Sequence, residues 1–217
     1  MKIAASYSFS MAYQFINNEY PHLRQEIQDI ISSIDAESCR LRVPNKQESV
    51  RARKLGVSHF FSIPHLQRAF MRRLLDKGWG IRPRINTTYS ARRQHRDLGA
   101  VKERLGLQIQ FGKHPYVVYD VLARMPIFEQ FGGIIAGIEI CPMASMIPHM
   151  PTGIGCFEDV AWDLSYKGDC DGNDTPVLVL GIEPNEFPSQ DNSYAILRGQ
   201  YVPSDDREVS LEGPIHI

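Results

Sequence analysis

The sequence predicts an α/β fold in which helices flank a mixed central β-sheet. Two continuous apolar runs, residues 134–140 and 175–182, are typical of central strands that are covered on both faces. Residues 20–33 and 62–78 carry apolar side chains at helical spacing, whereas residues 105–111 alternate apolar residues with Gly and Gln. Because helical and strand patterns alternate along the chain, we expect an α/β core.

The first predicted helix covers residues 20–33. Leu23, Ile27 and Ile30 recur at helical spacing, and Pro21 stands at the start, where a helix makes no use of the missing N–H. The stretch after Ala36 loses this periodicity, so we expect a loop there.

The second predicted helix begins after Ser62, which is a favourable N-cap residue, and has Pro64 in its first turn. Apolar residues follow at helical spacing until Gly78, which we expect to end the helix. Residues 81–90 alternate weakly and indicate a strand with basic residues on one side.

The second half of the chain predicts most of the sheet. Residues 105–111 indicate a strand with one apolar face, followed at Tyr116 by nine residues with the length of a buried helix. Their Val and Tyr content leaves a strand open there. The last thirty or so residues are polar and contain proline. We therefore expect one domain over residues 1–184 and a C-terminal peripheral arm over residues 185–217.

The composition is that of a soluble globular protein. The chain has 217 residues, 43% of them hydrophobic, and a net charge of −1, so it needs no disulfide or metal ion to fold. No apolar run approaches the roughly 18 residues of a membrane span, and the first residues lack a signal peptide's apolar stretch. The four cysteines are widely spaced. We expect reduced thiols, a cytoplasmic location and no membrane partner.

The near-zero net charge hides a strong asymmetry. Residues 40–104 hold 17 basic and four acidic residues, a net charge of +13, whereas the rest of the chain carries −14. Arg outnumbers Lys here, and the guanidinium group binds phosphate with two parallel hydrogen bonds. This pattern favours a nucleic-acid partner. The alternative is a solvated basic face without a partner.

Several strings, in the same order along the chain, resemble the type II restriction endonucleases of the BglII/BstYI family, with the likeness to BstYI the closer. The resemblance covers roughly residues 1–184. It is carried by Tyr20-Pro-His-Leu, Lys102-Glu-Arg, Ile109-Gln-Phe-Gly-Lys, Tyr119-Asp, Glu139-Ile-Cys-Pro-Met, Thr152-Gly-Ile and Pro176-Val-Leu-Val-Leu-Gly-Ile.

The resemblance implies a restriction-endonuclease-like core and a homodimer that acts on duplex DNA in restriction and modification. It implies a palindromic site containing GATC and Mg²⁺-dependent cleavage of one phosphodiester in each strand. Such cleavage needs a hard cation held by carboxylate oxygens, which polarises the phosphoryl group and activates a water molecule. The family supplies these ligands as an Asp on one strand and a Glu-x-Gln on the next.

The sequence departs from this pattern at both metal ligands. The family's Glu-x-Gln corresponds to Gln108 and Gln110, and its Asp corresponds to Gly99. Asp97, two residues upstream, and Glu103 are the nearest replacements. The candidate catalytic residues are therefore Gln108, Gln110, Asp97 and Glu103, with Asp97 and Gln108 as candidate ligands of Mg²⁺ if the protein is active.

The resemblance also implies DNA contacts. Lys113 and Thr152 correspond to positions that contact bases in the family, and both side chains can donate hydrogen bonds to base edges. We expect Arg92, Arg93 and Arg96 to contact phosphates. The alternatives are a solvated lysine after a turn at residue 113 and a simple turn residue at 152. Asp120 is expected to have a surface or helix-capping role, with a place behind the metal ligands as the alternative.

Two functional hypotheses follow. The first is a site-specific deoxyribonuclease that binds a GATC-containing palindrome and cleaves it with Mg²⁺. The second is a degenerate homologue that binds DNA site-specifically without cleaving it.

Overall fold

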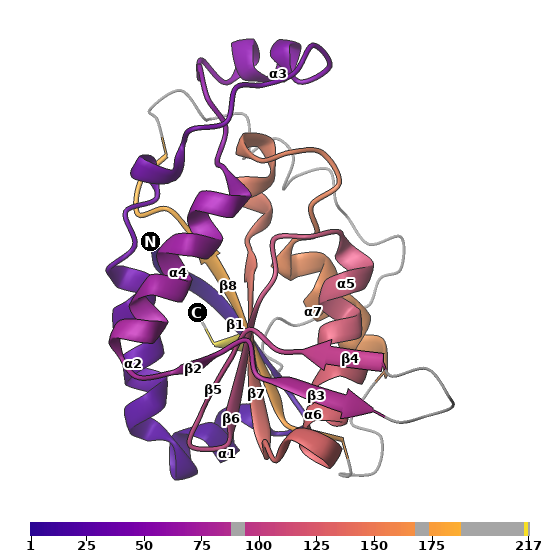
Figure 1. Cartoon of the computed structure of the whole chain (residues 1–217). Helices are drawn as coiled ribbons and strands as arrows, with labels where there is room; N and C mark the ends of the chain where they lie inside the picture. The colour runs from indigo at the N-terminus through magenta and orange to yellow at the C-terminus, as the bar shows by residue number, and fades with distance from the viewer. Residues whose placement is uncertain (88–93, 168–173, 188–214, 217) are drawn as a thin grey trace.

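A seven-stranded mixed sheet forms the centre of the computed structural model, which describes residues 1–87, 94–167, 174–187 and 215–216 (Figure 1). The strand order is β2-β5-β6-β7-β8-β1-β9, with β6, β7 and β8 parallel and the other neighbours antiparallel. The strands are β1 (Lys2–Phe9), β2 (Gly80–Ile81), β5 (Ala100–Lys102), β6 (Leu105–Ile109), β7 (Ala136–Pro142), β8 (Val177–Glu183) and β9 (Ile215–His216). A separate hairpin joins β3 (Arg84–Thr87) and β4 (Gln94–Asp97).

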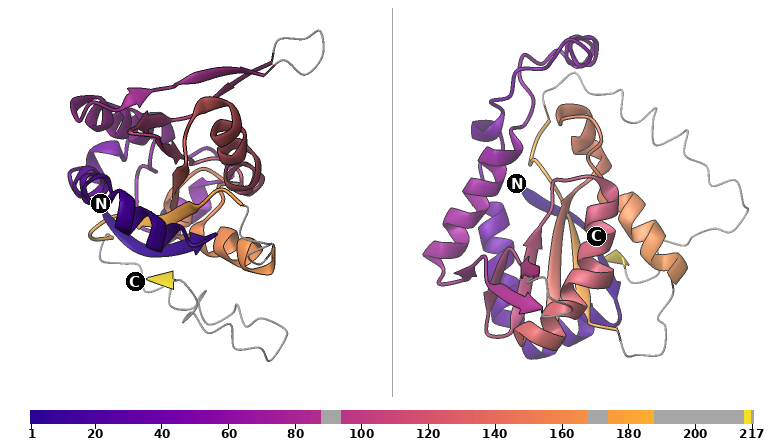
Figure 2. Two further views of the ribbon diagram at one scale, coloured as in Figure 1. Left: turned by 90° about the horizontal axis from the view of Figure 1, so that it is seen from below. Right: turned by 45° about the vertical axis from the view of Figure 1, so that its right-hand side comes forward.

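Helices cover both faces of the sheet, which confirms the predicted α/β class (Figure 2). One face packs against α1 (Ala12–Glu19), α2 (Pro21–Ser32) and α4 (Ile63–Asp76). The other face packs against α5 (His114–Tyr119), the π-helical turn η2 (Asp120–Arg124), α6 (Met125–Gly132) and α7 (Phe157–Lys167). The shorter elements are η1 (Glu37–Cys39), α3 (Ser49–Lys54) and η3 (Ala144–His149).

The helices and strands with clear periodicity lie where the sequence predicts them. The helix after Tyr20, the helix that begins at Ser62 and the three apolar strands are confirmed within two residues at most ends. The ambiguous segment after Tyr116 is helical and contains the π-turn η2. The loop expected after Ala36 contains the short helices η1 and α3, which sequence periodicity missed.

The first strand was not predicted, because its small and polar residues give no strong periodicity. Strand β1 pairs with β8 along almost its whole length, from Lys2 with Glu183 to Phe9 with Val177. Its conformation is therefore determined by a partner about 175 residues away in the sequence. In the predicted arm, Ile215 and His216 pair with β1 as the edge strand β9, and residues 188–214 lie outside the described residues.

Strand β6 is more deeply buried than its alternating pattern indicates. All five of its residues are buried, including Gln108, which is 9% exposed. The prediction of a single apolar face was incomplete, because the second face lies under helices on the side of η2. A polar side chain there must find hydrogen-bond partners within the protein.

Among the described residues, Cys39, Cys141 and Cys156 are buried and free, and Cys170 lies outside them. None of the helices that the structure describes is long and apolar enough to span a membrane.

Candidate functional site

The candidate site lies where β6 continues past the first residue of the antiparallel strand β5. Strand β5 begins at Ala100, so Gly99 lies beside the second half of β6. The Gly99 N–H donates a hydrogen bond of 2.7 Å to Oε1 of Gln108. A Cβ atom on Gly99 would lie 2.8 Å from the carbonyl oxygen of Leu107. The two positions at which the family carries acids are therefore neighbours, but the backbone at Gly99 leaves no room for a side chain.

A cavity of about 770 Å³ opens at this edge of the sheet. Its charged lining consists of Arg68 from α4, Arg82 from the segment between β2 and β3, Arg124 from η2, and Asp97 from the end of β4. Gln108 lines the cavity from β6. Three guanidinium groups face one exposed carboxylate, so the cavity is suited to an anion more than to a cation.

Asp120 lies behind the cavity in the π-helical turn. Its side chain is fully buried, with Oδ2 accepting a hydrogen bond of 2.9 Å from Nε2 of Gln110 and Oδ1 lying 3.2 Å from Nε of Arg124. The expected surface or capping role for Asp120 was wrong, because the helix turns this residue toward β6. Burial raises the pKa of the Asp120 carboxyl above its ordinary value, while Arg124 and hydrogen bonds from Gln110 and Gln108 oppose the rise.

Glu139 is the second buried acid and pairs in register with Gln108 across β6 and β7. Its side chain is fully buried, and neither carboxylate oxygen has a hydrogen-bond partner among the described residues. Burial raises the pKa of Glu139 well above its ordinary value, Asp120 adds to this rise and Arg124 opposes it. An unpaired buried carboxylate favours its neutral form, so the burial of Glu139 opposes a negative charge at this position.

This buried acid predicts how stability depends on pH. The folded state keeps the Glu139 proton at pH values where the unfolded chain has released it, because the folded pKa is the higher. The free energy of unfolding therefore falls as pH rises above about 4.3, the ordinary glutamate pKa, by at most about 1.4 kcal/mol per pH unit. Glu139→Gln should remove this loss, so the variant gains stability relative to the wild type as pH rises. Urea unfolding at a series of pH values measures the difference, and parallel pH profiles would contradict the assignment.

The resemblance implies a divalent metal ion, but the residues at this edge do not fit one. Oε1 of Gln108 already accepts the Gly99 N–H, and Gly99 has no side chain. Within the described part of the chain, no three His, Cys, Asp or Glu side chains form a group that could hold a metal ion. Mg²⁺ needs several oxygen ligands and charged groups among them. The three arginines of the cavity oppose a cation.

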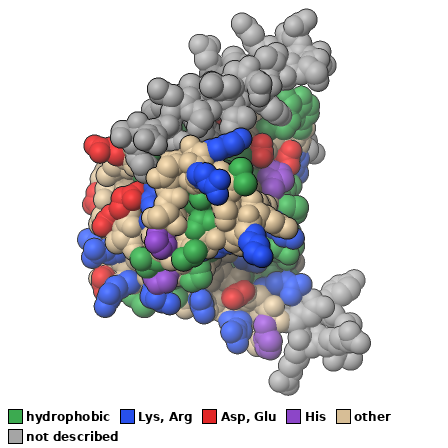
Figure 3. Space-filling model, turned by 90° about the horizontal axis from the view of Figure 1, so that it is seen from above, with side chains coloured by type: hydrophobic (Ala, Val, Ile, Leu, Met, Phe, Trp, Pro, Cys, Tyr) green, Lys and Arg blue, Asp and Glu red, His purple; other side chains and the backbone are tan. Residues whose placement is uncertain are grey.

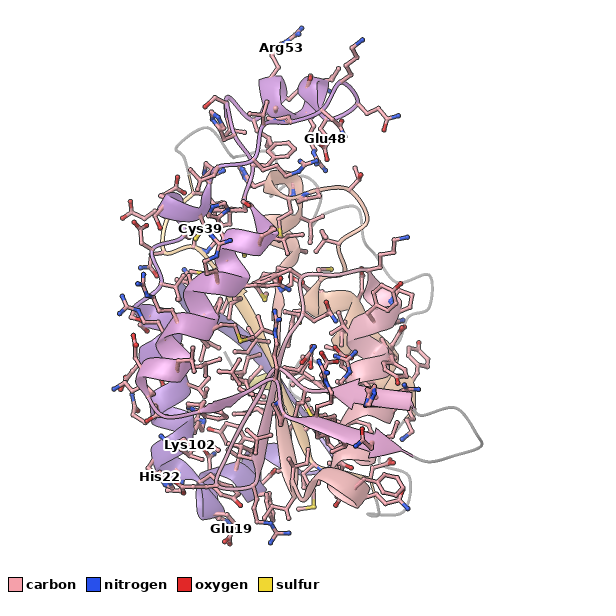
Figure 4. The ribbon with its side chains drawn as sticks, viewed as in Figure 1. Glu19, His22, Cys39, Glu48, Arg53 and Lys102 are labelled. Carbon is pink, nitrogen blue, oxygen red and sulfur yellow. The ribbon has the colours of Figure 1, made fainter. Side chains whose placement is uncertain are left out.

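The four predicted catalytic residues do not form one group. Gln108 and Gln110 point toward the buried Asp120 from β6, and Asp97 lines the cavity as an exposed residue. Glu103 lies in the turn between β5 and β6, at the far end of these strands, where its Oε2 is 2.9 Å from Nε2 of His22. His22 and Lys102 mark that end of the molecule in Figure 4.

The two predicted base-contacting residues lie at one end of the sheet. Lys113 follows the carboxyl end of β6, Thr152 follows that of the parallel strand β7, and both are exposed. The Gly155 N–H donates a hydrogen bond of 2.9 Å to the Gly112 carbonyl, which joins the two loops. The structure therefore joins the loops that carry these two residues, which are 39 positions apart.

The segment around α3 supports the Thr152 loop. Nη2 of Arg51 donates to the carbonyl of Met150 at 2.6 Å. Glu48, which is 2% exposed, lies 2.9 Å from Arg42 and accepts a backbone hydrogen bond from Thr152. Glu48 and Arg53 are seen at the top of Figure 4. The backbone of Thr152 is thus held by a basic segment while its side chain stays exposed.

The contact between the two loops predicts a large effect at Gly155. A Cβ atom there would lie 2.5 Å from Cα and 2.8 Å from the backbone N of His114. Backbone atoms cannot move aside as a flexible side chain can, so Gly155→Ala should destabilise the fold by about 1–3 kcal/mol. Gly80→Ala is the matched control, because its Cβ would meet its nearest atom at an ordinary 3.4 Å. Equal unfolding midpoints for the two variants would contradict this prediction.

The basic residues of 40–104 are partly used within the protein. Arg40 pairs with Glu37, Arg42 and Arg51 lie beside Glu48, and Lys102 pairs with Glu26. Arg96 donates to the His95 carbonyl, and Arg92 and Arg93 lie outside the described residues. Ten others make no ion pair with a described carboxylate: Lys46, Arg53, Lys54, Arg68, Arg72, Arg73, Lys77, Arg82, Arg84 and Arg104.

Nine of these ten residues lie in or beside α3, α4 and the β2–β3 segment, whereas Arg104 lies in the turn between β5 and β6. In Figure 1, α3 lies at the top, while α4 and the β3–β4 hairpin lie in front of the sheet. Figure 3 shows Lys and Arg side chains over several parts of the face seen from above, with hydrophobic and His side chains among them. Most of the basic charge therefore stays available to a polyanion.

Sequence reasoning missed Arg124 and Glu139 as site residues. Arg124 lies outside the basic segment, so counting charges could not find it. Its spacing of four from Asp120 is that of an ion pair on a helix and was the available signal. Glu139 lies within an apolar run, and only its register with Gln108 shows where its side chain lies.

Comparisons with known proteins bear on the family and the fold. The sequence profile of the family described as restriction endonuclease BglII/BglIII matches residues 4–182. A crystal structure of restriction endonuclease BglII complexed with a DNA 16-mer has a TM-score of 0.64 and 14% identity, over 83% of this chain and 76% of that one. A crystal structure of free BglII has a TM-score of 0.58 and 16% identity, over 85% and 81%. No curated protein matches. At these identities, the structural likeness shows the fold.

Proposed function

Since the chain belongs to the BglII/BglIII restriction endonuclease family, we propose that it binds duplex DNA at a palindromic GATC-containing site without cleaving it. We propose a homodimer, because twofold protein symmetry matches the symmetry of a palindrome. The closer likeness to BstYI and the cytoplasmic location stay predictions, as does the role of residues 185–217.

One observation supports the proposal that the protein does not cleave DNA. Where the family has two carboxylates, this chain has Gly99 and Gln108, joined by a hydrogen bond and facing a cavity lined by three arginines. Without charged oxygen ligands, a hard cation loses its main source of binding energy. The phosphoryl group then lacks the polarisation and the activated water that hydrolysis requires.

The proposal of DNA binding is supported by the ten basic residues that make no ion pair with a described carboxylate. Their charges can neutralise phosphates along a duplex, and such contacts supply affinity without sequence preference. Lys113 and Thr152, exposed on two adjoining loops, are the proposed readers of base edges. Lysine suits the O6 and N7 acceptors of guanine in the major groove.

Cleavage with Mg²⁺ is the second candidate function, favoured by one feature of the site. Asp120 and Glu139 are two carboxylates behind Gln108, near enough for Asp120 to raise the pKa of Glu139. Asp97 is the third acid of this region, although the described side chains of the three do not form a group that could hold a metal ion. The burial of Asp120 and Glu139 and the neighbouring Arg124 make this the weaker candidate.

A binding and cleavage assay on the same duplex tests the proposal. A labelled duplex with a central GATC palindrome and a second duplex with the same bases in scrambled order are titrated with the protein. Both are then incubated with Mg²⁺ or Mn²⁺ and resolved on a denaturing gel. We expect tighter binding to the palindrome and intact strands with both metals. Strand cleavage would support the second candidate, and equal binding to both duplexes would overturn site specificity.

A further inference from the structure

The arginines of the cavity come from three separate parts of the chain. Arg68 lies on α4, Arg82 lies between β2 and β3, and Arg124 ends the π-turn η2. Three guanidinium groups and one exposed carboxylate line the cavity, so an anion inside it would meet more positive than negative charge. Neither Arg68 nor Arg82 makes an ion pair with a described carboxylate.

Arg124 is held in place before any ligand binds. Its Nε lies 3.2 Å from Oδ1 of the fully buried Asp120, and its guanidinium carbon lies 5.7 Å from the centre of the Tyr119 ring. Asp120 is itself fixed by the hydrogen bond of 2.9 Å from Gln110. A planar guanidinium group with one edge fixed can present its remaining N–H groups without a large loss of entropy.

Arg82 is positioned by its backbone. Its φ angle is +51°, in the left-handed region that residues other than glycine rarely adopt, and its N–H donates to the Gly99 carbonyl at 3.0 Å. This backbone bond ties Arg82 to the residue that contacts Gln108. Unfavourable backbone conformations of this kind persist where the surrounding structure enforces them, often at ligand sites.

From these observations we infer that the cavity is a metal-independent subsite in which Arg68, Arg82 and Arg124 bind one backbone phosphate of duplex DNA. The inference deepens the proposed function and rests on it. Guanidinium groups match the oxygens of a phosphate with paired, charge-assisted hydrogen bonds. Gln108, a neutral side chain, removes the repulsion that a carboxylate at this position would exert on the phosphate. The cavity thus retains a phosphate-binding function that needs no cation.

Fluorescence anisotropy with the labelled GATC duplex in excess EDTA tests this inference. Arg124→Gln should weaken binding by about ten-fold or more, because a hydrogen-bonded charge is lost. The slope of log affinity against log salt should decrease in magnitude by at most about one, since the subsite binds one phosphate. Arg24→Gln is the matched control, because Arg24 is also partly buried and lies over an aromatic ring, Tyr13, but outside the cavity. It should leave affinity and slope unchanged.

Two further variants keep the test valid if Arg124→Gln disturbs folding by leaving Asp120 without its partner. Arg68→Gln and Arg82→Gln change exposed side chains, and each should weaken binding and reduce the salt slope without a change in unfolding midpoint. Arg124→Lys should recover part of the affinity, because it restores the charge without the fork of N–H donors.

Three results would overturn the inference, and they differ from failure of the proposed function. The first is wild-type affinity and slope in all the Arg→Gln variants while the wild type still binds the duplex. The second is that the wild type binds DNA only when Mg²⁺ is present, whereas Asp120→Asn binds DNA without Mg²⁺. The third is that inorganic phosphate stabilises the wild type but not Arg124→Gln, while the two proteins bind DNA with the same affinity. The subsite would then bind a free anion and not the DNA backbone. A wild type that binds no duplex would instead remove the proposed function, and the subsite with it.

Discussion

The affinity for duplex DNA is expected to fall by about 10³-fold when salt rises from about 50 to about 200 mM, if about six phosphates are contacted. Each contacted phosphate releases counterions from the duplex, so added salt opposes binding in proportion to their number. Nine Lys and Arg residues in or beside α3, α4 and the β2–β3 segment make no ion pair with a described carboxylate and are available for such contacts. Anisotropy titrations of the GATC duplex across the salt series measure the slope.

As a control, unfolding curves at the lowest and highest salt concentrations should show that the protein stays folded across the series. A fall of less than about ten-fold would indicate one or two contacted phosphates at most. The basic segment would then be a solvated face, and the case for a DNA-binding protein would rest on family membership alone.

Gln108→Glu is expected to lower the free energy of unfolding in EDTA by about 3–5 kcal/mol, the usual cost of an uncompensated buried charge. The new carboxylate would be 9% exposed and would lie beside Asp120 and Glu139, whose pKa values are already raised. With a third acid, the group gains the charged oxygens that Mg²⁺ needs. Mg²⁺ should therefore restore stability to the variant, because a ligand that binds only the folded state stabilises it. Urea unfolding with and without Mg²⁺ measures both effects.

Gln47→Glu makes the same chemical change at an exposed position and should alter stability by no more than about 0.5 kcal/mol. Gln108 is the better position to change first, since a side chain at Gly99 would meet the backbone of β6 at 2.8 Å. If Mg²⁺ stabilised the wild type as strongly as it stabilised the Gln108→Glu variant, the wild type would already have a metal site. The proposal of a degenerate site would then fail.

The sequence pointed to Gly99 and Gln108 as neighbours but not to the interactions around them. The resemblance placed Gly99 and Gln108 together, and they are joined by a hydrogen bond. It could not show that Asp120 is turned inward, because the direction of a helical side chain depends on the packing of α5 and η2 against β6. Glu103, three residues after β5 begins, lies at the opposite end of the strands beside His22, because the β5–β6 turn carries it away.

The sequence by itself determined the α/β class, the buried strands β7 and β8 and the amphipathic helices α2 and α4, because apolar periodicity depends only on neighbouring residues. It also determined the excess of basic charge, which is a matter of composition, and it places Gly99 and Gln108 where the family resemblance implies carboxylates. Only the tertiary structure decided that Arg68, Arg82 and Arg124 share one cavity and that Glu139 lies opposite Gln108. Such groupings join distant segments through strand register and helix packing, which no local pattern encodes.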